Sequence, residues 1–482
     1  MDYFQLEYGL LAKGPDLVET IPALVKLKEL CPKYIEKAEE IQVLARKFAR
    51  KEIMPRFLEI DTKCSKNPEY FDWELWRKIN KEKLNISFIP EEMGGLGINC
   101  LGVMALTEEI SSVCMPTAAN ITFNSFALSA AMVENKPSIN LRIIKEMLEA
   151  QRNEKPLFWA WAITEPSAGT DVEDAHAMAT MKPSAYAEKV KGGYNIKGTK
   201  CFITNGSLAS YVIATICTDV SNPLESMATF LIPSSSKGFS VGRIERKCGQ
   251  KASLTAELNF DDVFVPEEDV WAPPGKGFQH TREMLAISRG FVGIIGLGIA
   301  KSAMERCIQF AYQKKIKNHR LIDEGWVQMA IADLMKDIKV VRSAAANYSI
   351  AVDTCHAARM FESLPVKLSL KLIPERLLLS ESLIALAKSP VVSEAGTKMK
   401  KEIVTDKITD MFIKEGSALK VAGTDLAMNV TSRVLDIVGL EGMSYKYGIE
   451  KCFRDAKLTQ IYEGTNQANK LEFFNGEIGA IM

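Results

Sequence analysis

The stretch GGYNIKGTKCFITNG, residues 192–206, decides the fold class, because the chain changes here from helical periodicity to alternation. Its apolar and polar residues alternate, and it ends in Asn205-Gly206, a strong tight-turn signal. Three similar segments follow, separated by Gly, Pro, Ser and Asn: SYVIATI (210–216), MATFLIP (227–233) and ELNFDDVFVP (257–266). Together they predict a small antiparallel β barrel or sandwich in the middle of the chain.

Helical periodicity flanks this β region on both sides. Upstream, KAEEIQVLARKFARKEIM (37–54) places Ile41, Ala45 and Phe48 on one face, and Pro55 then follows the helix. Downstream of Gly277, long amphipathic segments continue to the end of the chain. We therefore predict an extension at 1–33, an all-α domain at 34–155, a central β domain at 156–275 and a C-terminal helical bundle at 276–482.

Composition excludes several classes of partner. A chain of 482 residues is too long for one simple core, so two or three domains are expected. Lys+Arg and Asp+Glu balance at 60 each, so no global field attracts nucleic acid or an anionic membrane. No uninterrupted apolar run reaches the roughly 18 residues that a membrane span needs.

Cysteine and histidine usage gives two further expectations. The ten cysteines are scattered without any Cys-x-x-Cys, and the N-terminus lacks the basic-then-apolar order of a secretion signal. We expect reduced thiols and a cytoplasmic location. None of the four histidines stands at i, i+4 from another or beside a cysteine pair, so we expect no metal site.

The segment IYEGTNQ, residues 461–467, holds the candidate catalytic residue. Glu463 precedes Gly464, whose missing Cβ lets a flat ligand or another backbone approach the carboxylate. This arrangement suits a general base held against a planar group. Taken alone, the segment also fits a helix C-terminus with a surface glutamate, so the other motifs carry the assignment.

Three motifs in order resemble the signature of the acyl-CoA dehydrogenase family. They are TEPSAGTD (164–171), GTKCFITNG (198–206) and Arg454-Asp455-Ala456 leading into 461–467. The resemblance covers roughly residues 34–475. It implies an all-α domain, a β domain and a four-helix C-terminal domain, with FAD at their junction, usually in a homotetramer.

The resemblance implies that Glu463 takes the α-proton of an acyl-CoA thioester while the β-hydride leaves toward flavin N5, which yields the 2,3-enoyl-CoA. Desolvation by the flavin and the acyl chain would raise the pKa of the glutamate toward the working pH. An electron-transferring flavoprotein is the expected electron acceptor. Two alternatives stay open: oxidase or elimination chemistry on the same base, and a non-catalytic acyl-CoA-binding or partner-binding member of the fold.

The resemblance also implies a set of cofactor contacts. Thr164 and Thr204 would hydrogen-bond the flavin ring near N5, although threonines at such positions also serve as β-turn partners, and Phe202 would cover the ring. The cofactor-binding residues expected in this way are Trp161, Ile163, Thr164, Gly169, Thr170, Phe202, Thr204, Lys314, Gly439, Thr465 and Gln467.

The sequence departs from the family where the FAD diphosphate would lie. Lys314 stands near a family arginine, and lysine keeps the charge but loses the bidentate fork. Asp436 and Glu441 add negative charge, and Leu440 replaces a glycine whose backbone would approach the anion. We therefore expect weaker or rearranged FAD binding.

Residues 113–127 match the region that lines the acyl tail in the family, and they contain no Arg or Lys. Relatives that accept a dicarboxylic acyl group place an arginine there, so we expect an uncharged tail. Arg289 matches a family arginine near the active site, or else marks a surface helix N-terminus. The expected substrate-binding residues are Thr117, Thr122, Phe123, Phe126, Thr170, Arg289 and Gly464.

An insertion at about 355–406 lies outside the family pattern. Its segment SLKLIPERLLLSESLIALAK (369–388) predicts an extra helix interrupted at Pro374. The insertion fits a surface hairpin, a cap over the acyl pocket or an interface segment, and these three interpretations stay open.

Overall fold

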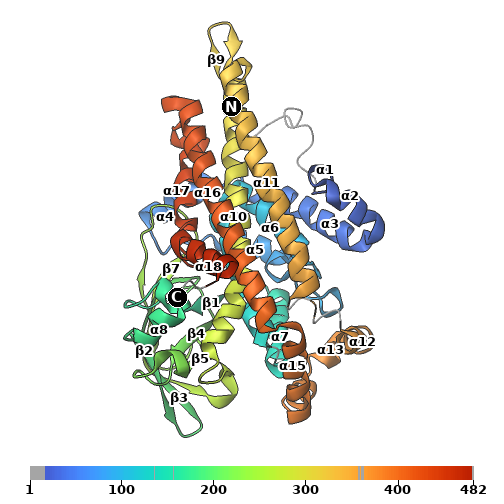
Figure 1. Cartoon of the computed structure of the whole chain (residues 1–482), viewed down its shortest axis with the longest axis vertical. Coiled ribbons are helices and arrows are strands. Elements are labelled where there is room, and N and C mark those ends of the chain that lie inside the picture. Colours follow the sequence, from blue (N-terminus) through green and yellow to red (C-terminus); the bar gives the residue numbers. More distant parts are fainter. Residues whose placement is uncertain (1–16, 135, 156, 357–358, 360–362, 480–482) are drawn as a thin grey trace.

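The structure is a computed structural model that describes residues 17–134, 136–155, 157–356, 359 and 363–479. Helices precede and follow the main β region, whose strands lie between Trp159 and Ala272 (Figure 1). The predicted fold class, mainly α with a central β domain and a C-terminal helical bundle, is confirmed.

The N-terminal helices pack their apolar face on the rest of the protein. In α3, Ile41, Ala45 and Phe48 are buried, as the periodicity predicted. α1 and α2 fall inside the segment described above as an extension. The helices are α1 (Leu17–Thr20), α2 (Pro22–Leu30), α3 (Pro32–Phe48), the π-helix η1 (Ala49–Ile53), α4 (Phe57–Lys66), α5 (Trp73–Lys81), α6 (Cys100–Glu134) and α7 (Pro137–Arg152).

The β region forms one eight-stranded sheet in the order β6-β7-β3-β2-β4-β5-β8, with β1 paired to β4. Most pairs are antiparallel, but β1 and β2 each run parallel to β4. The strands are β1 (Trp159–Ala162), β2 (Ala185–Val190), β3 (Gly193–Thr204), β4 (Tyr211–Cys217), β5 (Met227–Pro233), β6 (Phe239–Ile244), β7 (Thr255–Pro266) and β8 (Val270–Ala272). Four short helical elements accompany them: η4 (Thr170–Glu173), α8 (Ala175–Thr180), α9 (Pro223–Ser226) and η5 (Glu267–Asp269).

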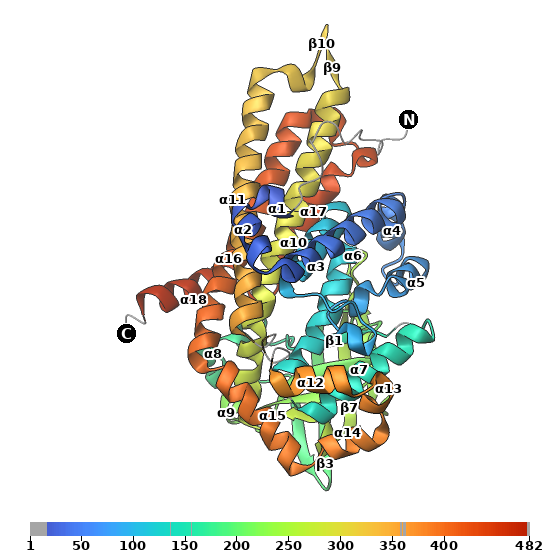
Figure 2. The same ribbon diagram turned by 90° about the vertical axis from the view of Figure 1, so that its right-hand side faces the viewer.

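The C-terminal bundle is built around α10, which Figures 1 and 2 show running through its centre. α10 is long and apolar enough to cross a membrane, but its most apolar 18-residue window is entirely buried in protein, as in a core helix. The elements are α10 (Gly277–Gln313), the hairpin of β9 (Lys315–Ile316) and β10 (His319–Arg320), α11 (Gly325–Cys355), α16 (Asp406–Gly442), α17 (Ile449–Thr459) and α18 (Asn466–Ile478).

Helices α10 and α16 touch through their backbones. A Cβ on Gly423 of α16 would overlap the carbonyl of Gly293 on α10 and lie 2.7 Å from its Cα. A Cβ on Gly293 would in turn overlap the carbonyl of Leu419. Glycine is therefore required at both positions. About one turn before this contact, Arg289 on α10 and Lys420 on α16 enter the region that carries the candidate base.

The insertion forms four short helices that lie over α7 (Figure 2): α12 (Leu364–Leu372), α13 (Glu375–Leu378), α14 (Glu381–Ala387) and α15 (Pro390–Ile403). The break at Pro374 was predicted, but the number of helices was not. New helices begin where the Ser380 side chain caps α14 by accepting from Leu383 N, and where Pro390 occupies the first position of α15. Ion pairs join Lys145 of α7 to Glu381 and Arg152 to Glu375.

The α10–α16 contact gives the first prediction. Gly423→Ala should lower the unfolding free energy by about 1–3 kcal/mol, because the added methyl group must push two helix backbones apart. Gly325→Ala is the control, since a Cβ there meets nothing within 4 Å. Thermal unfolding should show a lower midpoint for Gly423→Ala only, and equal midpoints would contradict the close contact.

Candidate active site

Residues 460–465 connect α17 to α18 and carry the candidate base. Glu463 and Gly464 both have left-handed backbone, with φ of 55° and 76°. Glycine adopts this conformation freely, whereas a glutamate does so at a cost of about 1–3 kcal/mol. The conformation of Glu463 therefore depends on contacts from its surroundings.

Two buried side chains hold this loop by its carbonyl groups. The Lys420 ammonium donates to the Gly464 carbonyl and to Asn466 Oδ1, each at 2.7 Å. The Asn469 amide donates to the carbonyls of Glu463 at 3.2 Å and Gly464 at 3.0 Å. Both side chains are fully buried, so water does not compete for these bonds. They fix the direction of the Glu463 peptide.

The Glu463 carboxylate is partly buried and faces α10. Ser288 Oγ donates a hydrogen bond to Glu463 Oε2 at 2.6 Å. Burial raises the pKa of Glu463, and the Ser288 hydrogen bond together with the charges of Arg289 and Lys420 opposes that rise. A carboxylate with a raised pKa is a better base near neutral pH than an ordinary glutamate.

Arg289 is fully buried within α10, so its interpretation as a surface helix N-terminus is wrong. Its guanidinium pairs with Glu173 at 3.0 Å and with Glu472 at 3.4 Å, and it donates to Ser417 Oγ at 3.1 Å. Sequence alone did not reveal this burial, because the helix continues twelve residues upstream of Arg289 to Gly277.

Aromatic contacts join the base loop to the N-terminal helices. The rings of Tyr462 and Phe123 meet edge to face, with centroids 5.8 Å apart. Gln250, after β6, donates to the Tyr462 hydroxyl at 3.4 Å. Phe123, predicted from sequence to line the acyl tail, therefore contacts the neighbour of the candidate base.

The other two motifs pack against each other beside the bulge in β3. Cys201 N donates to the Thr164 carbonyl at 3.0 Å. Between them lies Lys200, whose buried ammonium donates to the carbonyls of Ile163 and Thr215 and to Glu165 Oε1, at 2.7, 2.7 and 2.8 Å. Lys200 thus joins the two segments.

The residues expected around the flavin ring leave polar groups and an aromatic face available. Phe202 is 58% exposed, and a β-bulge in β3 holds it at φ 57°. In the described part of the chain, the buried Trp161 Nε1 has no hydrogen-bond partner. No described residue hydrogen-bonds the hydroxyl groups of Thr164 and Thr204 either. These features fit a flavin ring, which needs an apolar cover and hydrogen bonds at its edge.

The remaining predicted cofactor residues divide into two groups. Thr170 Oγ1 accepts from Thr465 N at 3.4 Å, and Thr465 caps α18 by accepting from Ala468 N at 3.2 Å. This contact joins the first motif to the base loop. Gly169 and Gln467 are exposed. Within the described residues, no side-chain hydrogen bond joins either of them to the base loop.

The region expected at the FAD diphosphate has its own internal pairing. Lys314 forms an ion pair with Glu441, so its charge is already compensated within the chain. Gly439 breaks α16 with φ 59°, and a Cβ there would meet nothing within 4 Å. Leu440 is 89% exposed. Gly439 leaves room for a ligand. The Lys314 charge is already paired with Glu441, so it does not offer an uncompensated positive charge to a phosphate group.

The predicted acyl-tail residues lie on α6. Thr117 and Thr122 are both buried. Thr117 lines a small cavity with α5 and Ala252, while Phe123 faces the base loop as described. The side chain of Phe126 lies outside the described residues.

Sequence reasoning missed several residues of this site: Glu173, Ser288 as a hydrogen-bond donor, Lys420 and Asn469. One signal was available for Lys420, because a lysine on the otherwise apolar face of a long helix needs a buried partner. Glu173 gave no such signal. Its role depends on Arg289, which is distant in sequence.

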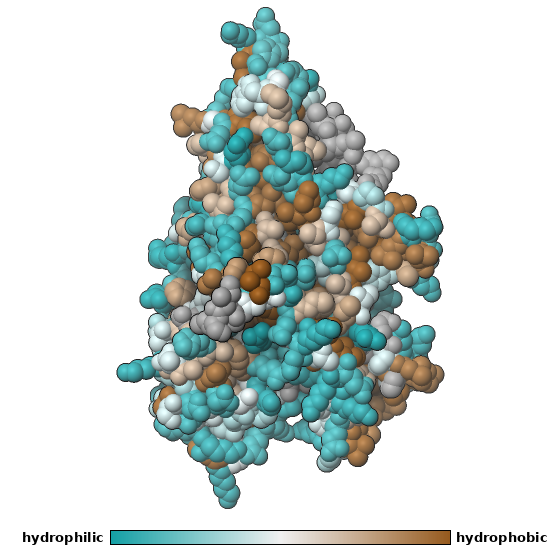
Figure 3. Space-filling model, in the orientation of Figure 1, coloured by the Kyte–Doolittle hydropathy of each residue, from teal (hydrophilic) through white to brown (hydrophobic). Residues whose placement is uncertain are grey.

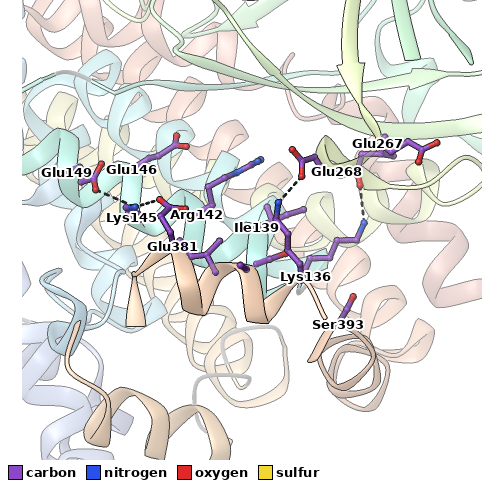
Figure 4. Close-up of a pocket in the computed structure, with 15 residues that line it drawn as sticks. Lys136, Ile139, Arg142, Lys145, Glu146, Glu149, Glu267, Glu268, Glu381 and Ser393 are labelled. Atoms are coloured by element: carbon purple, nitrogen blue, oxygen red, sulfur yellow. Dashed lines mark hydrogen bonds and ion pairs between the residues drawn. The ribbon is translucent and has the colours of Figure 1, made fainter. Parts of the chain in front are cut away.

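A cleft of about 590 Å³ lies elsewhere, between α7, the segment after β7 and the insertion helices. Figure 4 shows that both acidic and basic side chains line it, including Lys145, Glu268 and Glu381. These charges largely pair with one another, and Glu463 does not line the cleft. Among the described residues, no group of three or more His, Cys, Asp or Glu could hold a metal ion.

Comparison with known families places this geometry in context. Three family profiles match: "Acyl-CoA dehydrogenase, N-terminal domain" at 35–135, the middle domain at 160–263 and the C-terminal domain at 275–371 and 386–472. Together they cover most of the chain and leave out part of the insertion. Fold and family define an FAD-dependent oxidoreductase. The chain belongs to the acyl-CoA dehydrogenase family.

Individual relatives are distant but extend over nearly the whole chain. The chain is 27% identical to cyclohex-1-ene-1-carbonyl-CoA dehydrogenase of Syntrophus aciditrophicus, over 90% of this chain and 88% of the relative. It is 27% identical to the short-chain specific acyl-CoA dehydrogenase of Clostridium acetobutylicum, over 90% and 96%. The structure of butyryl-CoA dehydrogenase from Megasphaera elsdenii matches with a TM-score of 0.71 at 24% identity, over 92% and 98%.

The Lys200 contacts give the second prediction. Lys200→Met should lower the unfolding free energy by about 3–5 kcal/mol, because it leaves the buried Glu165 carboxylate without its cation. Lys197→Met, which removes a partly exposed lysine from the same strand, is the control and should change stability by about 1 kcal/mol or less. Similar unfolding midpoints for the two variants would contradict the joining role of Lys200.

Proposed function

We propose that this enzyme removes the α-proton and the β-hydride of an acyl-CoA thioester to give the 2,3-enoyl-CoA, with Glu463 as the α-proton base. The observation that carries the proposal is the Glu463 carboxylate itself. It has a raised pKa, a fixed left-handed backbone and a position next to the contact between Tyr462 and Phe123.

The α-proton of a thioester is only weakly acidic, so its removal needs a positioned base and polarisation of the carbonyl oxygen. Glu463 supplies the base, and its own backbone N–H is our candidate donor to the thioester oxygen. FAD, when bound, supplies the acceptor for the β-hydride. The left-handed conformation lets one residue present its side chain and its N–H to the same substrate. Lys420 and Asn469 keep that conformation in place before substrate arrives.

Ser288 adjusts the basicity of Glu463. Its hydrogen bond stabilises the carboxylate form and so limits the rise in pKa that burial causes. The pKa of Glu463 stays above that of an exposed glutamate, which makes Glu463 the stronger base. Ser288 also directs Glu463 Oε2 toward α10, which restricts the positions that the other oxygen can take.

We propose an uncharged acyl tail, because residues 113–127 of α6 contain no arginine or lysine. Relatives support an acyl-CoA substrate in general, since their names include short-chain and cyclic acyl groups.

Further parts of the proposal concern partners and location. We propose an electron-transferring flavoprotein as acceptor, and one solved structure with this fold comes from a study of the electron transferring flavoprotein of Acidaminococcus fermentans. A homotetramer would cover exposed apolar residues on α11, namely Trp326, Met329 and Val340, and Figure 3 shows apolar side chains gathered on the bundle. A cytoplasmic location agrees with the unpaired cysteines.

The third prediction tests the base. Glu463→Gln should bind acyl-CoA within a few-fold of the wild type but lose about 10²–10⁴-fold in turnover with an artificial electron acceptor, because an amide cannot take the α-proton. Glu477→Gln on α18 is the control, since its exposed carboxylate pairs with Lys414, away from the base loop. Near wild-type turnover in Glu463→Gln would remove Glu463 from the mechanism.

The fourth prediction tests the acyl tail. Thr122→Arg should raise the ratio of kcat/KM for acyl-CoAs that end in a carboxylate over uncharged ones by about tenfold or more, because a buried guanidinium needs an anionic partner. Thr122→Leu controls for the change in size. If both variants keep the wild-type preference, this segment does not reach the tail.

A further inference from the structure

One acidic side chain next to the candidate base has no place in the mechanism above. Glu173 is the last residue of η4 and stands two residues after the end of the TEPSAGTD motif. Its side chain is only 11% exposed, and it lies against Gly464, the residue after the base. A buried carboxylate at this position needs an explanation, because burial of a charge is costly without a partner.

The single turn η4 contacts the base loop from both of its ends. At its start, Thr170 Oγ1 accepts from Thr465 N at 3.4 Å. At its end, Glu173 Oε2 sits so close to Gly464 that a Cβ on this glycine would lie 2.5 Å from the carboxylate. The same hypothetical Cβ would lie 3.4 Å from Arg289 Nη2, which binds Glu173 at 3.0 Å. The ion pair therefore lies directly against the Gly464 backbone.

We propose that Glu173 is a positioning residue for the base: by binding Arg289 against Gly464, it fixes the peptide that carries Glu463 and balances the cationic charge beside it. The inference rests on the proposed role of Glu463. The Glu173 carboxylate, which belongs to the β domain, thereby sets the basicity of Glu463 in the C-terminal 460–465 loop.

Charged side chains face Glu173 from each of the elements that pack against it. Arg289 on α10 and Lys420 on α16 are cationic, while Glu463 in the loop and Glu472 on α18 are anionic. With Glu173 ionised, the anions outnumber the cations in this buried region. Burial raises the pKa of Glu173 to about 7, the Arg289 charge opposes that rise, and the Glu463 charge adds to it. The two glutamates therefore titrate as a coupled pair.

The sign of the effect on Glu463 follows from these contacts. The Glu463 charge raises the pKa of Glu173, and by the same repulsion an ionised Glu173 raises the pKa of Glu463. An ionised Glu173 also compensates Arg289, whose charge lowers the pKa of Glu463. Removing the Glu173 charge therefore lowers the pKa of Glu463 through both effects. The base would then become weaker and would ionise at lower pH.

The experiment compares Glu173→Gln with Asp174→Asn, a neighbouring loss of one negative charge at an exposed cap of α8. In the wild-type holoenzyme, kcat/KM should keep rising with pH up to about 7, where Glu173 ionises. In Glu173→Gln this last part of the rise should be lost, so that the acidic limb ends about one unit lower in pH. Asp174→Asn should leave the limb in place. An unchanged limb in Glu173→Gln would overturn the inference, because a purely structural ion pair has no reason to move it.

A second readout does not depend on activity. A glutamate whose folded pKa lies above its unfolded value of about 4.3 costs stability as pH rises between those two values. The unfolding midpoint of Glu173→Gln minus that of wild type should therefore increase between pH 5 and 7.5. The increase should be smaller in a Glu463→Gln background, and the Asp174→Asn difference should stay constant.

These readouts separate two failures. If the wild type oxidises no acyl-CoA, the proposed function fails, and the midpoints still decide whether Glu173 and Glu463 are coupled. If the wild type is active but the Glu173→Gln and wild-type midpoints run parallel with pH, the coupling is absent and the inference is overturned.

Discussion

The site depends on the close contact between α10 and α16 at Gly293 and Gly423. Because no side chain separates the two helix backbones, Arg289 and Lys420 reach the 460–465 loop from neighbouring helices. Lys420 holds the loop by the Gly464 carbonyl, and Arg289 holds η4 against the same glycine. A wider crossing would displace both cations and remove what keeps Glu463 in its left-handed conformation.

Buried charge is the second organising feature. Lys420 has its pKa lowered to about 7 by burial, although the nearby carboxylates Glu173 and Glu463 oppose this shift. Such a cluster is poor at stabilising a fold, because desolvation offsets much of its Coulomb attraction. It is well suited to setting the pKa of a base in a region from which substrate and cofactor would exclude water. The geometry therefore indicates a site shaped for proton transfer more than for stability.

Sequence predicted the parts of this structure that local pattern controls. The alternation of apolar and polar residues predicted the strands around residues 192–206. The 3.6-residue period of apolar residues predicted the buried face of α3, and Pro374 predicted the helix break. Contacts between distant elements were not predictable. The burial of Arg289 depends on Glu173 and Glu472, more than 100 residues away in the chain, and the pairing of Lys314 depends on Glu441. The motifs identified Glu463 but not the lysine and asparagine that hold its peptide.

The central claim is that Glu463 begins the oxidation of an acyl-CoA with an uncharged acyl tail in a flavin-containing site. The most direct measurement is an anaerobic visible absorbance spectrum of the purified protein, before and after addition of straight, branched and cyclic acyl-CoAs. The account predicts a bound oxidised flavin whose absorbance bleaches with one of these classes. A protein that holds no flavin even when FAD is supplied, or a flavin that stays oxidised with every acyl-CoA, would contradict it.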